Sequence, residues 1–291
     1  MHAFDYVKPN SLEQVGELLA QAQEDVRILA GGTELLLQIE RGEVKPALVL
    51  DIKGLPDLDF VRFDYEQGLT IGATTTVTDL MRNHDVRKHY PLLAQACSIM
   101  ATEQIRNRAT VGGNVCSGFV FSDFAPVLMC YDAVCHLWGP RGQRAMRIED
   151  FCREGARLSL AQDELLVSVQ VPTPWAESWG DYQKLRPGQG AHFALAAAAV
   201  FACRVEETLT DWRVAVTAVA PYPQRLPEVE KLLDDGQMTE ALLQHVAERV
   251  SETVAPVPDP RAGITYRKAM AGIMVARGVQ NVTAYLLGGR H

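Results

Sequence analysis

The sequence predicts an α+β protein built from three successive units. Near the N-terminus, two strand-like apolar runs flank a short helical segment, which indicates a small α/β unit. Hairpin signals mixed with helical patterns then indicate a second unit, and long strand-like runs followed by amphipathic helices indicate a third. A chain of 291 residues is long for a single core. We therefore expect domains at residues 1–54, 55–175 and 176–291.

The first unit opens with a helix that Ser11 can cap, because a serine hydroxyl accepts a free backbone N–H at a helix start. The apolar residues on one face of this helix are Leu12, Val15, Leu18 and Leu19. Periodicity then predicts a strand at 26–30, a short helix at 34–41 ended by Gly42, and a strand at 47–52. Alternating strands and helices predict a compact α/β arrangement.

The second unit opens with hairpin signals over residues 54–73. Helices are expected at 78–84, 92–100 and 124–131, and the segment WGPRGQ (138–143) is typical of a hairpin turn. The residues that mark the end of this unit are Pro172, Pro174 and Trp175.

The third unit begins near Trp179. Its segments HFALAAAAVFACRV (192–205) and DWRVAVTAVA (211–220) predict two paired strands. Helices are expected at 228–233, 239–254 and 264–287. The last helix is amphipathic, which most often indicates a face packed on a core.

Composition and charge exclude several classes of protein. The net charge of −8 argues against nucleic-acid binding and against anionic membrane surfaces, although local backbone donors can still hold phosphate. The nearest candidate for a membrane span, 191–203, falls short of the roughly 18 apolar residues that a span requires. The start MHAFDYVKPN lacks a basic segment followed by an apolar one, so we expect no secretory signal and a cytoplasmic protein.

The cysteines and histidines show no metal-site spacing. Six cysteines stand at positions 97, 116, 130, 135, 152 and 203, without any C-x-x-C pair. This spacing argues against the usual iron–sulfur and zinc patterns in this chain, and in the cytoplasm it favours unpaired, mostly inert thiols. Because no nucleophile–base pair is evident either, we expect neither metal ligands nor catalytic residues here.

The most informative feature is a pair of glycine loops, AGGTE (30–34) and TVGGN (110–114). Each follows apolar residues and leads into another apolar run, so each is interpreted as a tight turn leaving a strand. Glycine reaches positive φ without a Cβ clash, and consecutive N–H groups can then form a nest that binds anions. A single Gly-Gly pair most often only ends an element. Two such loops fit the two phosphates of a dinucleotide.

Polar side chains accompany these loops. The hydroxyl, amide and carboxylate groups suited to phosphate, ribose and ribityl contacts belong to Thr33, Thr110, Asn114 and Asp123. The chain has no G-x-G-x-x-G, no G-x-x-x-x-G-K-[ST] and no G-x-S-x-G motif. It therefore lacks the usual signatures of a Rossmann dinucleotide site, a P-loop and an α/β-hydrolase. Asp123 also precedes an expected helix, where a carboxylate is favoured without any ligand.

Four segments share an order and spacing that extend beyond the glycine loops. They are ILAGGTELLLQI (28–39), QIRNRATVGGNVCSG (104–118), SDFAPVLMCYDA (122–133) and YQKLR (182–186). Together they resemble the FAD-binding medium subunit of the xanthine dehydrogenase, or molybdenum hydroxylase, family, which includes the carbon monoxide dehydrogenase flavoprotein. The similarity runs from about Phe4 to YRKAMAGIMVARGV (266–279) and so covers nearly the whole chain.

The resemblance implies a fold and a cofactor. It implies a two-part FAD-binding domain of the PCMH type, a small α/β unit plus a larger mixed unit, followed by a CO dehydrogenase flavoprotein-like C-terminal α+β domain. FAD is expected to be bound non-covalently, because neither glycine loop contains a cysteine or histidine.

The resemblance also implies the residues of the flavin site. A first pyrophosphate loop would comprise Ile28, Leu29, Ala30, Gly31, Gly32, Thr33, Glu34 and Leu35. A second would comprise Thr110, Val111, Gly112, Gly113 and Asn114. Asp123 would bind ribityl or ribose hydroxyls, and Leu166 and Lys184 would lie along the isoalloxazine or its polar edge. Met100 would stand near the flavin, and core packing is the alternative for both Leu166 and Met100.

The function implied is electron transfer within a complex. Electrons would arise at a molybdenum cofactor in a large subunit, pass through 2Fe-2S clusters in a small subunit, and reach FAD here before NAD⁺ or another acceptor. Two other hypotheses stay open. One is a free-standing FAD oxidoreductase of the vanillyl-alcohol-oxidase type, and the other is a binding or assembly protein without the cofactor. The organic substrate cannot be read from this chain.

Two departures from the family pattern leave the identity of the electron acceptor undetermined. His192 stands where many members have an aspartate, after the stretch that contains Lys184. Phe119, Val120 and Phe121 replace small polar residues between the second glycine loop and Asp123. Their bulk would change flavin exposure or the surface that meets the iron–sulfur subunit.

Overall fold

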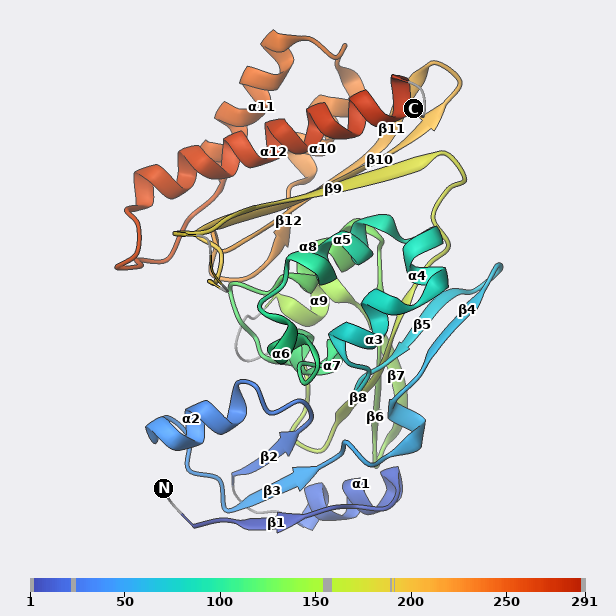
Figure 1. The fold of residues 1–291 in the computed structure, drawn as a ribbon, viewed down its shortest axis with the longest axis vertical. Helices are drawn as coiled ribbons and strands as arrows, with labels where there is room; N and C mark the ends of the chain where they lie inside the picture. Colours follow the sequence, from blue (N-terminus) through green and yellow to red (C-terminus); the bar gives the residue numbers. More distant parts are fainter. Residues whose placement is uncertain (1–2, 22–24, 154–158, 189, 191, 289–291) are drawn as a thin grey trace.

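The computed structural model describes the chain except for residues 1–2, 22–24, 154–158, 189, 191 and 289–291. The described residues form three β-sheets that follow one another along the sequence and along the long axis of the molecule (Figure 1). Helices accompany each sheet, so the α+β class predicted from the sequence is confirmed.

The first sheet is parallel and has the order β1-β3-β2. Its strands are β1 (Asp5–Val7), β2 (Val26–Leu29) and β3 (Leu48–Asp51), and its helices are α1 (Leu12–Gln21) and α2 (Leu35–Arg41). The Ser11 hydroxyl accepts the Gln14 N–H at 3.2 Å. Gly42 ends α2 with φ 73°. Both helix-end predictions are confirmed, because a hydroxyl satisfies a free N–H and glycine adopts the left-handed turn.

The second sheet is antiparallel and has the order β4-β5-β8-β6-β7. Its strands are β4 (Val61–Asp64), β5 (Gly68–Gly72), β6 (Val134–Gly139), β7 (Gly142–Arg147) and β8 (Leu165–Val171). The two expected hairpins are therefore confirmed as β4–β5 and β6–β7. The central strand β8 was not predicted, because its partners lie far away in the sequence, as in the pairing of Leu69 with Val171.

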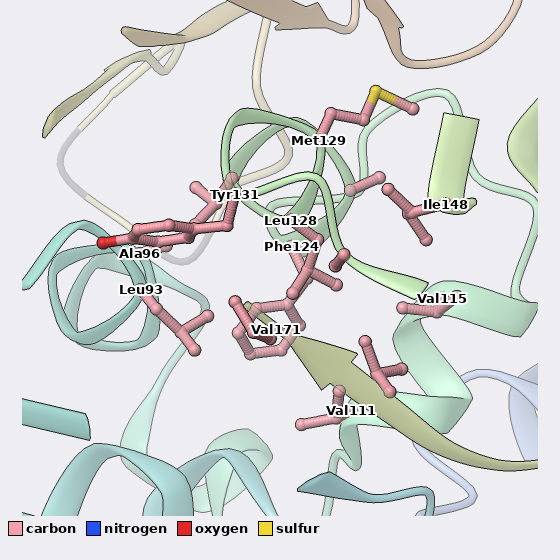
Figure 2. Close-up of a cluster of buried hydrophobic side chains, with 14 of the residues drawn as sticks. Leu93, Ala96, Val111, Val115, Phe124, Leu128, Met129, Tyr131, Ile148 and Val171 are labelled. Atoms are coloured by element: carbon pink, nitrogen blue, oxygen red, sulfur yellow. The ribbon is translucent and has the colours of Figure 1, made fainter. Parts of the chain in front are cut away.

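Short helices surround this second sheet. They are a 3₁₀-helix (Pro56–Leu58), α3 (Val77–Arg82), α4 (His84–His89), α5 (Pro91–Ile99), α6 (Glu103–Arg106), α7 (Val111–Cys116), α8 (Phe124–Cys130) and α9 (Ile148–Cys152). The helix expected at 78–84 ends earlier, because the Asn83 side chain accepts N–H groups of Asp85 and Val86 and starts a new helix there. Phe124 and Leu128 of α8 lie in the core beside Val111 and Val115 of α7 (Figure 2).

The third sheet is antiparallel and has the order β12-β11-β10-β9. Its strands are β9 (Ser178–Leu185), β10 (Ala196–Val205), β11 (Thr208–Thr217) and β12 (Gln224–Arg225). Its helices are α10 (Pro227–Asp235), α11 (Glu240–Thr253) and α12 (Ile264–Leu287), which cover one face (Figure 1). The predicted pairing of β10 with β11 is confirmed.

Strand β10 is buried on both faces. Ala196, Ala198, Val200 and Ala202 pack toward the helices of the third sheet, whereas Ala197, Ala199, Phe201 and Cys203 join the core of the second unit. Successive side chains of a strand point to opposite faces, so a strand covered on both sides is apolar throughout. The third sheet therefore packs directly on α5 and α8, with β9 against α5 and with β10 and β11 against α8.

Candidate functional site

The first glycine loop joins the end of β2 to the start of α2. Gly32 has φ +74°, in the left-handed region, as the nest hypothesis expects. Within the described part of the chain, no backbone N–H from Gly31 to Leu35 has a hydrogen-bond partner. This loop therefore presents consecutive free donors, an arrangement suited to phosphate oxygens.

The prediction of a tight turn at the second glycine loop is wrong, because this segment forms the start of helix α7. Thr110 is the N-cap of α7, and its hydroxyl accepts the Gly113 N–H at 3.0 Å. The N–H groups of Val111 and Gly112 donate to Thr75 and Ala73 carbonyls at 3.0 and 2.9 Å. Helix capping and contacts with the segment that follows β5 thus use these donors, and neither Gly112 nor Gly113 has a positive φ.

The glycines of the second loop allow close packing instead. A Cβ at Gly112 would lie 2.6 Å from the Ala73 carbonyl oxygen, and one at Gly113 would lie 2.8 Å from the Thr110 hydroxyl. The donors that remain are on side chains. The Thr110 hydroxyl keeps its own proton, and among the described residues the Asn114 amide nitrogen has no partner.

The fold brings the two loops together at the junction of the first and second sheets (Figure 1). A Cβ at Gly31 would lie 2.2 Å from the Arg108 carbonyl oxygen and 3.0 Å from the Ala109 Cα. On the other side, the Ala30 Cβ lies 4.0 Å from the Cβ position of Gly113. The two loops, 80 positions apart in the sequence, therefore form one continuous surface, and its free donors fit the pyrophosphate of a dinucleotide.

Asp123 precedes α8 and is buried in an ion pair. The Lys184 ammonium lies 2.8 and 2.9 Å from its two carboxylate oxygens, with 3% of the lysine side chain and 8% of the aspartate side chain exposed. The Tyr182 hydroxyl donates to Oδ1 at 2.7 Å. Burial raises the pKa of Tyr182 well above its usual value, with the Asp123 charge adding to the effect, so the phenol keeps its proton.

Helix capping, the alternative for Asp123, is wrong. Its side chain caps no N–H, and the Ser122 hydroxyl accepts the Ala125 N–H at 3.1 Å instead. The Ser122 hydroxyl in turn donates to the Asn114 side chain at 2.7 Å. This bond connects the second glycine loop to the segment that carries Asp123.

Tyr182 and Ser122 were missed by the sequence analysis. Tyr182 stands two residues before Lys184 in the segment YQKLR, and residues two apart lie on the same face of a strand. That alternation is the signal that could have placed Tyr182 at the site. No comparable signal points to Ser122, because serine is common next to helix starts.

Two residues expected along the flavin lie in the core of the second unit. Leu166 is on β8 opposite Leu137, and Met100 directly follows α5. Both are buried, with 2% and 8% exposed. This burial favours the core-packing alternative, and flavin contact by Leu166 stays a prediction.

The bulky segment Phe119–Phe121 is held against the third sheet. The Val120 carbonyl accepts the Ala218 N–H at 2.6 Å and the Thr217 hydroxyl at 2.8 Å. The Phe121 ring stacks on Phe193 at 5.6 Å between centroids, and Phe119 lies 6.0 Å from the same ring. Phe193 is 53% exposed, so this aromatic cluster reaches the surface. Phe193 directly follows His192, the residue that differs from the family pattern.

The cysteines are dispersed thiols. All six are unpaired, and burial raises the pKa of Cys97, Cys116, Cys152 and Cys203 to about 12. Over the described ranges, no three side chains of the His, Cys, Asp and Glu types converge as metal ligands. No helix in that part of the chain is long and apolar enough to cross a membrane.

Comparison with family models defines the class of protein. Residues 2–174 match the FAD binding domain in molybdopterin dehydrogenase, and residues 181–282 match the CO dehydrogenase flavoprotein C-terminal domain. The fold is thus that of an FAD-binding oxidoreductase subunit.

Individual relatives are similar to this chain over nearly its full length. The carbon monoxide dehydrogenase medium chain of Hydrogenophaga pseudoflava is 32% identical and covers 95% of this chain and 96% of its own. The xanthine dehydrogenase FAD-binding subunit of Escherichia coli O157:H7 is 29% identical and covers 96% of both chains. A solved structure of the Hydrogenophaga pseudoflava carbon monoxide dehydrogenase matches with a TM-score of 0.93, 31% identity and 97% coverage of both chains. This chain belongs to the family of FAD-binding medium subunits of molybdenum hydroxylases, as the sequence motifs predicted.

Proposed function

We propose that this chain transfers electrons within a cytoplasmic three-subunit complex. Its FAD would receive them from the 2Fe-2S clusters of a small subunit and deliver them to NAD⁺ or another acceptor, while a large subunit oxidises the substrate at a molybdenum cofactor. The observation that carries the proposal is the meeting of the two glycine loops: the first presents free N–H donors, and a hydrogen bond between Ser122 and Asn114 connects the second to the segment of Asp123.

The chain's own residues supply binding and orientation. The N–H groups from Gly31 to Leu35 would hold the pyrophosphate, and the Thr110 hydroxyl and Asn114 amide would donate from the second loop. The Asp123 carboxylate would accept hydroxyls of the ribityl chain or ribose, with Lys184 beside it. When bound, FAD accepts electrons singly and releases them as a pair, which is the chemistry a two-electron acceptor requires.

The partner subunits follow from what this chain and its relatives contain. The thiols of this chain are scattered, and over the described ranges no three His, Cys, Asp or Glu side chains converge as metal ligands, which does not suit cluster ligation. Relatives are named as medium chains of carbon monoxide dehydrogenase, which also has a structure described as a Cu,Mo enzyme. We therefore place both the clusters and the molybdenum cofactor on partner subunits.

The test of the cofactor is direct. The purified chain should be yellow and should release FAD on acid precipitation, because no cysteine or histidine lies in either loop. A protein that takes up no FAD on reconstitution would refute the flavin site. Flavin that stays with the polypeptide through acid would instead show a covalent link, for which Cys116 is the nearest thiol.

The test of electron transfer uses the chain alone and then the complex. Stopped-flow mixing of the FAD-loaded chain with NADH should bleach the flavin, whereas purines, aldehydes and N-heterocycles should give no turnover. Absence of bleaching would indicate another acceptor and would implicate the Phe119–Phe121 cluster, which stands near the second loop. Turnover of an organic substrate by the isolated chain would support a free-standing oxidoreductase instead.

A further inference from the structure

Strand β9 reaches across from the third sheet to the flavin site. Tyr182 and Lys184 lie on the same face of β9, and both contact Asp123 on the segment before α8. Tyr182 is 1% exposed and the Asp123 residue is 6% exposed. A buried carboxylate is therefore held by two groups from a sheet that the glycine loops do not belong to.

The position of Tyr182 is itself secured from α5. The Gln95 side chain accepts the Tyr182 N–H at 2.8 Å and donates to the Asp181 carboxylate at 2.9 Å. On the opposite side of β9, Asn281 of α12 donates to Asp181 at 2.9 Å. Hydrogen bonds from both neighbouring layers thus fix this short stretch of β9 relative to α5 and α12.

The two contacts to Asp123 have different geometric effects. Lys184 lies almost equally far from both carboxylate oxygens, so it does not distinguish between them. The aspartate χ2 torsion has a broad, roughly two-fold profile. The Tyr182 hydroxyl binds one oxygen alone and so fixes the plane in which the carboxylate lies. A carboxylate oxygen accepts about two hydrogen bonds. Oδ1 already contacts both Tyr182 and Lys184, whereas among the described residues Oδ2 contacts Lys184 alone, so accepting capacity remains on Oδ2.

We propose that Tyr182 is a positioning residue for the flavin, acting through Asp123. It orients the carboxylate so that the remaining lone pair of Oδ2 meets a hydroxyl of bound FAD, while Lys184 balances the charge. This inference rests on the proposed function. It makes the third sheet a contributor to FAD binding even though both glycine loops belong to the first two units.

The experiment compares FAD affinity and flavin spectra of full-length variants. Y182F removes one oxygen and should weaken FAD binding by about tenfold, because a hydrogen bond to a charged group is lost. It should also shift the visible absorption maxima and the midpoint potential of the flavin that binds. The matched control is Y90F, which removes another buried hydroxyl, bound to the Val171 carbonyl at 3.3 Å and away from Asp123. Y90F should leave affinity, spectrum and potential unchanged.

A double-mutant cycle separates positioning from simple structural support. In a D123A background, adding Y182F should change the FAD dissociation constant by less than twofold, because the group through which Tyr182 acts is gone. A tenfold effect that persists in D123A would overturn the proposal. Wild-type affinity and an unshifted spectrum in Y182F would overturn it as well, while FAD binding by the wild-type chain would leave the proposed function standing.

A second variant covers the case in which Y182F does not fold. Q95M removes the side-chain bond to the Tyr182 N–H but keeps the phenol, and we expect a roughly threefold weaker FAD complex with the same direction of spectral shift. Circular dichroism establishes the fold of each variant. A folded Q95M with wild-type affinity and spectrum would then overturn the proposal.

Discussion

Replacing Gly31 with alanine should separate the two glycine loops. A Cβ there would lie 2.2 Å from the Arg108 carbonyl oxygen, whereas carbon and oxygen atoms in contact are about 3.3 Å apart or more. The loops would have to part by about 1 Å, because the opposing atoms are backbone and no side chain can rotate away. Overpacking of this kind costs about 1–3 kcal/mol. If this cost reduces the free energy of FAD binding, the dissociation constant rises by about 5- to 150-fold.

The assay for G31A is a titration of the apo-protein with FAD, paired with urea unfolding. Gly31 does not have a positive φ, so alanine tests the close contact rather than backbone strain. G54A is the matched control, since a Cβ at Gly54 would meet no heavy atom of the described residues within 4 Å. If G31A binds FAD as tightly as the wild type, close approach of the loops is not required, and our reasoning about the site fails.

Further predictions concern the same loops, the buried ion pair and acid stability. G32V and G113V should both lose bound FAD while remaining folded, as flavin-to-protein ratios would show. Gly32 has φ +74°, which valine resists, and a side chain at Gly113 would meet the Thr110 hydroxyl that caps α7. K184M should lower the free energy of unfolding in urea by about 3–5 kcal/mol, since it leaves a buried carboxylate without its cation; an unchanged midpoint would contradict this. The Arg261 guanidinium lowers the pKa of Asp259 to about 2, so the pair stabilises the fold above about pH 4 and loses this contribution as the pH falls toward 2. R261M should therefore flatten the acid limb of a stability–pH curve.

Local features were predicted well because they depend on neighbouring residues. Ser11 and Gly42 mark helix ends through hydrogen bonds and backbone conformation within a few positions. The hairpins and the pairing of β10 with β11 join segments separated by short turns. The motifs around both glycine pairs were sufficient to predict the family, which the comparisons confirm.

Non-local pairing could not be read in the same way. β8 fills the centre of the second sheet, yet its neighbours β5 and β6 lie dozens of residues earlier. The second glycine pair was predicted to be a positive-φ turn, whereas its N–H groups bind Ala73, Thr75 and Thr110. The Thr110 bond is a local helix cap, but the bonds to Ala73 and Thr75 depend on where the end of β5 meets α7, and no local pattern encodes that meeting.

The sequence by itself determined the family, the glycine loops and the residue types available for binding FAD. The tertiary structure decided which groups act together. Asp123 meets Tyr182 and Lys184, 59 and 61 positions away, and not the helix start beside it. The physical reason is burial: once the third sheet packs on α5 and α8, a carboxylate between them requires a cation and a donor, and β9 provides both.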